Sequence, residues 1–575
     1  MQGARALVNV LAESGVEHVF GLPGDTGMAF YDALRDARSD IEHVMTRDER
    51  SASFMADVYA RVSGRVGVCE GPSGAGATYI LPGVAEAQGS AIPLLCLTSD
   101  TPVDQQGRGV LTELDQESLF RPVTKWNTRV SSATTMAEAA RRAVRMATSG
   151  RPGATHLSLP TDGLEGETPD SSVYGVAELG VAPAMRIVPD QGLVERAAAE
   201  LAAATRPVIV AGGGVLTSGG WNELTALAEA LNIPVATSIN GKGSIAETSA
   251  VAIGVIGGNG ARQYANACLA DADLVLYVGT RTDSTTTCHW TLPPLANPPR
   301  VIQVDVEPFE VGNNYPLVVG LLGDAKLTLA ALLEAIPRTG AVSARNQPRI
   351  SQLQAEGRRY WTEVELQAAE RTRPIKPAQV VRAMRDALDD EAIIVADPGT
   401  PTPFLSAQYE LRRAGRTTVI PRAHGGLGYA IPGVVGAWYA GGGRRVVGMT
   451  GDGSFGMSVG ELETVTRLGL PIVIIQCSNG TFGWIKELQH LYHGDRYFGV
   501  DFNPVDYAAI ARGFGFCAAQ VTDPDDVERA VHAAVADGRP YFLDIVTESP
   551  VTETPPVAAW TTAEAVRPVA VGARQ

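Results

Sequence analysis

One stretch of this chain, residues 444–479, limits most strongly what the chain can fold into. It reads RRVVGMTGDGSFGMSVGELETVTRLGLPIVIIQCSN. Residues 446–449 and 472–476 are apolar and rich in β-branched side chains, as buried parallel strands are, and residues 458–468 have apolar positions at helical spacing. With a tight turn at 451–453 before the helix, the stretch predicts one βαβ unit.

Asp452 and Asn479 close the two strands of that unit, 27 residues apart (479 − 452 = 27). Adjacent parallel strands end at the same edge of a sheet, so both side-chain oxygens are expected to point toward one place. Magnesium and calcium prefer oxygen ligands, and backbone N–H groups at residues 454–456 could donate hydrogen bonds to the phosphates that accompany such ions. The alternative is an ordinary turn, because Gly-Asp-Gly by itself is common.

Length and composition limit the number of domains, the kinds of partner and the compartment that we expect. At roughly 150 residues per domain, 575 residues predict three or four domains. The chain has 63 acidic and 47 basic residues, a net charge of −16, which argues against a nucleic-acid or anionic membrane partner. The six cysteines lack paired spacing, and we see neither a signal-peptide start nor an apolar run of about eighteen residues, so a cytoplasmic protein is expected.

Alternating strand and helix patterns predict an α/β fold with three doubly wound parallel-sheet domains. The first is expected over residues 1–165 and the third over residues 375–548, with similar length and rhythm. Residues 164–185, rich in Glu, Gly, Pro and Ser, predict a linker to a central α/β domain over residues 186–336.

Two further segments carry local expectations. The three glycines at 212–214 follow a predicted strand but complete no GxGxxG motif, so a packing turn is favoured over a nucleotide site. The tail after Thr547 is rich in Pro, Ala and Val and is expected to be loosely held.

The Gly-Asp-Gly turn, followed at the right distance by Asn479-Gly480-Thr481, resembles the thiamine diphosphate signature of the acetolactate synthase and benzoylformate decarboxylase superfamily. The resemblance runs from Val19 to about Ile545. It implies two cofactors, thiamine diphosphate and Mg²⁺, with the metal held by Asp452, Asn479 and the carbonyl of Thr481. It also implies that the three domains are pyrimidine-binding, central and diphosphate-binding.

Glu49 opens a predicted helix that ends in Tyr-Ala-Arg-x-x-Gly at residues 59–64. This block is similar to the one that supplies the family's activating carboxylate to the aminopyrimidine ring of the cofactor. The alternative is a solvated carboxylate at a helix start. Because the family's glutamate and metal site belong to different subunits, the resemblance implies a homodimer or homotetramer with the site at the subunit interface.

Other predicted site residues rest on the same resemblance. Leu427 stands where the family places a bulky apolar side chain that bends the cofactor, and His424 either faces the substrate or caps a strand. Asp25, in Pro23-Gly24-Asp25, matches an aspartate that moves protons in pyruvate decarboxylase-type enzymes. Thr400 and Thr402 are expected to donate to the diphosphate, the alternative being an ordinary proline-rich turn. The remaining expected cofactor contacts are Pro23, Ser73, Gly425, Gly451, Gly453, Ser454 and Phe482.

The resemblance implies decarboxylation of a small, pyruvate-like 2-oxo acid and transfer of the acyl carbanion equivalent to a carbonyl acceptor. Thr124-Lys125-Trp126 matches acetolactate synthases, whereas residues 111–115 stand where carboligases of this group tend to show Phe-Gln-Glu and predict an altered acceptor pocket. Three alternatives stay open: a decarboxylase that releases an aldehyde, a flavin-dependent oxidase, and a non-catalytic subunit. Residues 279–283 resemble one segment of flavin-binding members, but no other is recognisable, so FAD is not favoured.

Overall fold

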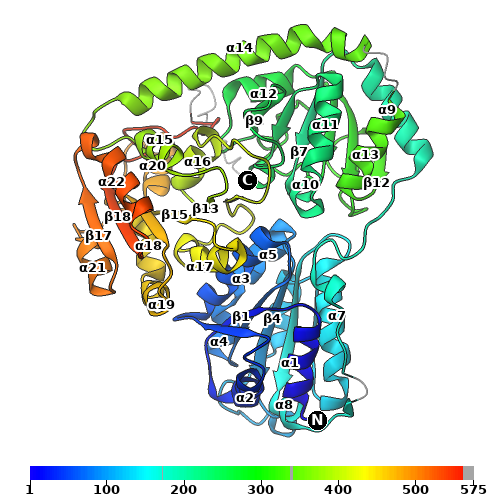
Figure 1. Cartoon of the computed structure of the whole chain (residues 1–575), viewed down its shortest axis with the longest axis vertical. Helices are drawn as coiled ribbons and strands as arrows, with labels where there is room; N and C mark the ends of the chain where they lie inside the picture. Colours follow the sequence, from blue (N-terminus) through cyan, green and yellow to red (C-terminus); the bar gives the residue numbers. More distant parts are fainter. Residues whose placement is uncertain (171–172, 337–340, 561–575) are drawn as a thin grey trace, which may run out of the picture.

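The computed structural model describes residues 1–170, 173–336 and 341–560. It contains three six-stranded sheets in which all strand pairs are parallel, each flanked by helices. In Figure 1 the blue N-terminal domain lies below, the green central domain at the upper right, and the yellow-to-red C-terminal domain at the upper left. The predicted fold class is confirmed.

The N-terminal sheet has the strand order β2-β1-β3-β4-β6-β5. All seven residues of its long central strand β4 are buried, because helices cover both faces of a parallel sheet. The strands are β1 (His18–Gly21), β2 (Glu42–Met45), β3 (Gly67–Gly71), β4 (Leu94–Asp100), β5 (Trp126–Arg129) and β6 (Ala154–Pro160). The helices are α1 (Gly3–Glu13), α2 (Met28–Asp36), α3 (Glu49–Ser63), α4 (Ala75–Tyr79), α5 (Leu81–Ser90), α6 (Gln116–Phe120), α7 (Met136–Thr148) and α8 (Thr161–Glu165).

The C-terminal sheet, β14-β13-β15-β16-β18-β17, repeats the strand order of the N-terminal sheet position by position. Its strands are β13 (Ile393–Ala396), β14 (Thr418–Val419), β15 (Val446–Gly451), β16 (Val473–Ser478), β17 (Cys517–Val521) and β18 (Tyr541–Val546). Its helices are α15 (Pro377–Ala387), α16 (Pro401–Gln408), α17 (Ala430–Gly441), α18 (Asp452–Ser458), α19 (Glu461–Arg467), α20 (Gly483–His493), α21 (Tyr507–Gly513) and α22 (Val527–Ala536). The two outer domains therefore share one topology.

The central sheet has a different order, β12-β11-β10-β7-β8-β9, which reverses between β10 and β7. Its strands are β7 (Pro207–Ala211), β8 (Val235–Thr237), β9 (Ala252–Val255), β10 (Leu274–Val278), β11 (Arg300–Asp305) and β12 (Leu317–Leu322). Its helices are α9 (Gln191–Ala203), α10 (Gly213–Ser218), α11 (Trp221–Leu231), α12 (Gln263–Ala270) and α13 (Ala325–Ala335). The long helix α14 (Ala341–Ala369) runs along the top of Figure 1 from the central to the C-terminal domain.

The outer domains pack through their equivalent helices α3 and α17. A side chain at Gly436 of α17 would place its Cβ 2.1 Å from the Met55 carbonyl oxygen of α3, so glycine is required there for the helices to approach. Beside this contact the rings of Phe54 and Tyr429 lie 5.0 Å apart, and the Tyr429 hydroxyl donates to the buried Asp57 carboxylate. The N-terminal domain thus directly supports the segment that leads into α17.

The local structure after β15 differs from the prediction. The expected turn at 451–453 is already helical, because α18 begins at Asp452 with Gly451 as its N-cap. The helix expected over 458–468 shortens to α19, which begins after Gly460. Glycines at 453 and 456 interrupt the apolar period of α18, which is why periodicity alone missed this helix.

The expectation of a loosely held tail is wrong as far as residue 560. The Lys376 ammonium pairs with the buried Glu553 carboxylate, and the ring of the buried Trp560 lies 4.3 Å from that of Trp484. The remainder of the predicted tail lies outside the described residues. Within those residues, no helix is long and apolar enough to cross a bilayer.

Candidate active site

Asp452 joins the carboxyl ends of β15 and β16. Its Oδ2 accepts the backbone N–H of Gly480 at 2.7 Å and of Asn479 at 3.1 Å, and its Oδ1 accepts that of Gly453 at 3.0 Å. Burial raises the pKa of Asp452 to about 6, because the ionised carboxylate has lost most of its water. A cation placed beside it would restore the stability of the charged form.

Asn479 and Thr481 follow β16 on the same side of the sheet and line the same cavity as Asp452. The Thr481 hydroxyl donates to the Val500 carbonyl at 2.8 Å, so the threonine side chain is engaged elsewhere. The Thr481 carbonyl accepts the N–H of Gly483 at 2.8 Å and has a second lone pair to offer. A carboxylate, an amide and a backbone carbonyl therefore belong to residues that line one cavity, and oxygen donors of these kinds are the ligands that Mg²⁺ prefers.

The cavity over these groups measures about 290 Å³. Gly425 and Gly480 adopt φ of +74° and +71°, and a Cβ added at either would meet no neighbouring atom within 4 Å, so open backbone can contact a ligand. The cavity and its donors fit a diphosphate with a metal ion. The three predicted metal-site residues line this cavity. Seven other expected cofactor contacts line it too: Thr400, Gly425, Leu427, Gly451, Gly453, Ser454 and Phe482.

Two predicted residues of this domain do not line the cavity. Thr402 is fully buried and its hydroxyl donates to the Asp397 carbonyl at 3.1 Å, so it supports the loop from beneath. The side chain of His424 is exposed, and its backbone N–H donates to Glu86.

Glu49 is the first residue of α3, at the edge of the N-terminal sheet. Asp48 caps the helix by accepting the N–H of Arg50 at 2.8 Å. Glu49 is buried, and a Cβ at Gly76 would lie 3.1 Å from its Oε1. Burial, helped by the nearby charges of Asp48 and Glu70, raises the pKa of the Glu49 carboxyl. A shielded carboxyl of raised pKa is suited to hold a proton against a ring nitrogen.

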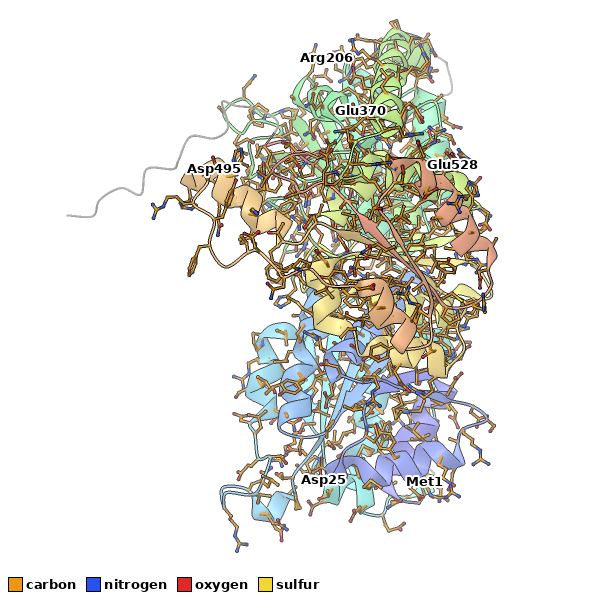
Figure 2. The ribbon with its side chains drawn as sticks, turned by 90° about the vertical axis from the view of Figure 1, so that its left-hand side faces the viewer. Met1, Asp25, Arg206, Glu370, Asp495 and Glu528 are labelled. Carbon is orange, nitrogen blue, oxygen red and sulfur yellow. The ribbon has the colours of Figure 1, made fainter. Side chains whose placement is uncertain are left out.

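Pro23 and Asp25 follow β1, and Ser73 follows β3, at the carboxyl edge of the N-terminal sheet. The Ser73 hydroxyl accepts from Thr26 at 3.2 Å, and the exposed Asp25 accepts the backbone N–H of Thr26 at 2.9 Å. Figure 2 shows Asp25 low in the N-terminal domain, well below the yellow and orange C-terminal elements.

The predicted site residues therefore form two groups, one on each outer domain. Neither Glu49 nor the residues grouped with it line the cavity that holds Asp452. Within the described chain, the Glu49 group and the Asp452 group do not share a cavity.

Sequence reasoning missed two buried glutamates. Glu70 on β3 accepts from the Tyr31 hydroxyl and lies 3.3 Å from His43 Nε2; an acid inside an apolar strand was the available signal. Glu86 on α5 carried no such signal. Its carboxylate accepts backbone N–H groups from four consecutive residues, 422–425, of the segment that leads to Leu427.

A further cavity of about 110 Å³ lies at the carboxyl ends of the central strands, where the strand order reverses. Gly213, Thr280 and Asp305 line it. A Cβ at Gly212 would lie 2.2 Å from the Gly279 carbonyl oxygen, and one at Gly214 would lie 2.7 Å from the Gly279 Cα. The glycine triplet thus lets two loops pack closely, and Gly213 and Gly214 also line the cavity, so the packing turn favoured over a nucleotide site stays a prediction.

Comparison with family models gives the class of protein. Residues 1–119 match the N-terminal TPP binding domain of thiamine pyrophosphate enzymes, residues 194–332 the central domain, and residues 397–545 the C-terminal TPP binding domain. The chain belongs to the thiamine pyrophosphate enzyme family. The resemblance inferred from the sequence is confirmed, and the two TPP binding domains make thiamine diphosphate the cofactor of this enzyme.

Within that family, this chain is similar to acetolactate synthases. A probable acetolactate synthase large subunit of Methanococcus aeolicus is 33% identical over 98% of this chain and 95% of its own length. The corresponding protein of Methanocaldococcus jannaschii is 32% identical over 95% and 92%. The acetolactate synthase isozyme 3 large subunit of Escherichia coli is 29% identical over 95% of each chain.

Proposed function

We propose that the protein is a carboligase: it decarboxylates a pyruvate-like 2-oxo acid and joins the remaining acyl unit to a second carbonyl compound. The observation that carries the proposal is the convergence of Asp452 and Asn479 on one cavity, in a chain similar to acetolactate synthases from end to end. When bound, thiamine diphosphate supplies a nucleophilic ring carbon that holds the electron pair left behind by CO₂.

The overall reaction balances without an oxidant or a reductant. The bond from the donor's carbonyl carbon to its carboxylate breaks and CO₂ leaves. The electron pair of that bond forms the new bond to the acceptor's carbonyl carbon, and the acceptor oxygen takes up one proton. Because the reaction involves no net redox change, it does not require a redox cofactor.

The residues divide this work between the outer domains. Asp452, Asn479 and the Thr481 carbonyl would hold Mg²⁺ against the diphosphate, and Leu427 would support the bent cofactor from the cavity wall. Glu49 would hold a proton at the aminopyrimidine ring, and Asp25 would move protons near the reacting atoms. His424, with its exposed side chain, is a weaker candidate for that work.

A second copy of the chain would bring the two groups of residues together, so we propose a homodimer or a pair of dimers. Large apolar side chains are exposed on both outer domains: Met28 and Tyr79 on the N-terminal domain, Met457 and Ile485 on the C-terminal domain. Such side chains are suited to a subunit interface. Six unpaired cysteines agree with a cytoplasmic location.

The test is to incubate the full-length protein with pyruvate, thiamine diphosphate and Mg²⁺ and to identify the products. Acetolactate or an acyloin supports the carboligase. Acetaldehyde alone would overturn the proposal. It would support the alternative decarboxylase, which the presence of Asp25 and Leu427 also favours.

A further inference from the structure

Helix α16 connects the cofactor cavity to the central domain. Thr400 and Pro401, its N-cap and first residue, line the cavity that also holds Asp452. The helix packs against β9 of the central domain (Figure 1). Its eight residues, at 1.5 Å each, separate the two ends by about 12 Å, so a displacement of one end moves the other.

Two buried cations of the central domain bind the last carbonyls of α16. Lys242 Nζ donates to the Ser406 carbonyl at 3.1 Å, and Arg262 Nε donates to the Ala407 carbonyl at 3.1 Å. Lys242 and Arg262 follow the neighbouring strands β8 and β9 and are only 2% and 1% exposed. The carboxyl end of a helix carries partial negative charge, so cations at these carbonyls stabilise the helix.

One carboxylate serves both cations. Glu247 Oε1 accepts from Lys242 at 2.8 Å, and its Oε2 lies 3.1 Å from Arg262 Nη2. Glu247 Oε2 also accepts the backbone N–H of Leu411, just beyond α16, at 2.9 Å. Among the described residues no other carboxylate pairs with Lys242 or Arg262, so at neutral pH the cluster carries one excess positive charge beside the negative end of the helix.

Lys242 is the member of this cluster whose charge changes between pH 7 and 9. Burial lowers the pKa of Lys242 to about 8, although Glu247 acts to raise it. Burial acts to raise the pKa of Glu247, but the two cations hold that pKa below its ordinary value. Burial acts to lower the pKa of Arg262, but Glu247 raises it.

Two tyrosines and one further acid also face the cluster. Tyr360 Oη, on α14, donates to the Ala407 carbonyl at 3.0 Å. Burial raises the pKa of Tyr360 and of Tyr264, so both hydroxyls stay neutral at pH 9. Glu410 acts on the charge of Lys242 from a greater distance and pairs with Arg412 Nε at 3.6 Å.

We propose that Lys242 is a positioning residue for the cofactor: its charge, held at the carboxyl end of α16, fixes the helix whose first residues would contact the diphosphate. This inference rests on the proposed cofactor site. Of the described residues that line that cavity, none belongs to the central domain, so the domain supports the site from behind. A neutral Lys242 amine keeps its hydrogen bonds but attracts the helix end less, so affinity for the cofactor falls.

The experiment measures the Kd of thiamine diphosphate by calorimetry, with Mg²⁺ in excess, at pH 7, 8 and 9. Full-length wild type is compared with Lys242→Met, which removes the charge and keeps much of the length of the side chain. Tyr360→Phe removes a neutral hydrogen bond to the same helix end. Lys326→Met, at an exposed lysine on α13 of the same domain, is the control. Thermal unfolding checks the fold of each variant.

Lys242→Met is expected to raise the Kd about 5- to 10-fold at pH 7 and less than about twofold at pH 9, where wild type has lost most of the same charge. The Kd of wild type and of Lys326→Met should rise together, about 3- to 5-fold, between pH 7 and 9. Tyr360→Phe should change the Kd by less than about threefold at every pH.

A Lys242→Met Kd that exceeds the wild-type Kd by the same factor at every pH would overturn the inference, because a purely structural role does not follow the charge. An unchanged Kd would overturn it too. If Lys242→Met does not fold, the wild-type curve decides: a Kd that is constant between pH 7 and 9 contradicts the inference. If Asp452→Asn leaves the Kd unchanged, the proposed cofactor site itself fails, and that result is distinct because it does not involve Lys242.

Discussion

Glu86 Oε2 accepts the backbone N–H of His424 at 2.7 Å, although the two residues belong to different domains and stand 338 positions apart. Through this contact and its neighbours, a carboxylate of the N-terminal domain sets the course of the segment that carries Leu427 in the C-terminal domain. The backbone at residues 422–425 forms a concave cluster of N–H donors around one anion.

Replacing Glu86 with Gln should therefore weaken cofactor binding. Burial acts to raise the pKa of Glu86, but Arg61 and the backbone N–H groups hold that pKa below its usual value, so the carboxylate is charged. The substitution removes this charge, and a neutral amide oxygen accepts fewer hydrogen bonds. We expect the Kd of thiamine diphosphate to rise about 5- to 20-fold, measured by calorimetry with Mg²⁺ in excess. Glu165→Gln, at the exposed end of α8, is the control. An unchanged Kd in a folded Glu86→Gln protein would show that this contact does not position the cavity.

Metal-free protein should show a pH-dependent stability that traces to Asp452. Its folded pKa of about 6 lies above the ordinary 3.8, so the neutral carboxyl favours the folded state. That contribution is complete below about pH 4 and is lost as the pH rises through about 6, an effect of about 2–3 kcal/mol. Thermal unfolding in EDTA between pH 4 and 7.5 should therefore show a larger loss for wild type than for Asp452→Asn. Parallel curves would contradict the assignment.

Added Mg²⁺ with thiamine diphosphate should reverse that loss in wild type and not in Asp452→Asn, because only a carboxylate gives the cation full charge compensation. Binding should weaken about tenfold per pH unit below about pH 6, as protons compete for Asp452. A Kd independent of pH between 5 and 7 would contradict this.

Glu49→Gln separates cofactor binding from activation. The amide keeps the shape of the buried side chain but cannot exchange a proton with the ring, so we expect kcat to fall about 10²- to 10⁴-fold. Because Glu49 does not line the cavity that would hold the diphosphate, the Kd of thiamine diphosphate should change by less than about tenfold. Steady-state rates and calorimetry on the same preparations decide this. Full activity in the variant would favour a protein that retains the fold without this chemistry.

Gly436→Val tests the contact between α3 and α17. The new Cβ would lie 2.1 Å from the Met55 carbonyl oxygen, and the helices would have to separate. We expect a loss of about 1–3 kcal/mol or more in the free energy of unfolding, measured with urea. Gly513→Ala, at a helical glycine with no atom within 4 Å of the added Cβ, should be neutral or slightly stabilising. A stable Gly436→Val protein would mean that the helix pair tolerates a wider spacing.

The candidate site could be foreseen from sequence where its signals are local. The pair Asp452 and Asn479 stands at the ends of two strands joined by one helical connection, and their spacing of 27 residues was enough to place them at one edge. The block around Glu49 is likewise continuous. In contrast, α18 was missed because its glycines interrupt the helical apolar period.

By itself, then, the sequence determined the three parallel sheets and the chemistry of each strand end, because β-branched runs, glycine turns and polar residues act over a few positions. Only the tertiary structure decided that Glu86 would hold residues 422–425, that Trp560 would rest on Trp484, and that Lys242 would bind the carboxyl end of α16. These contacts join residues far apart in the chain, and the free energy of burying a charge or a ring depends on neighbours that no local pattern records.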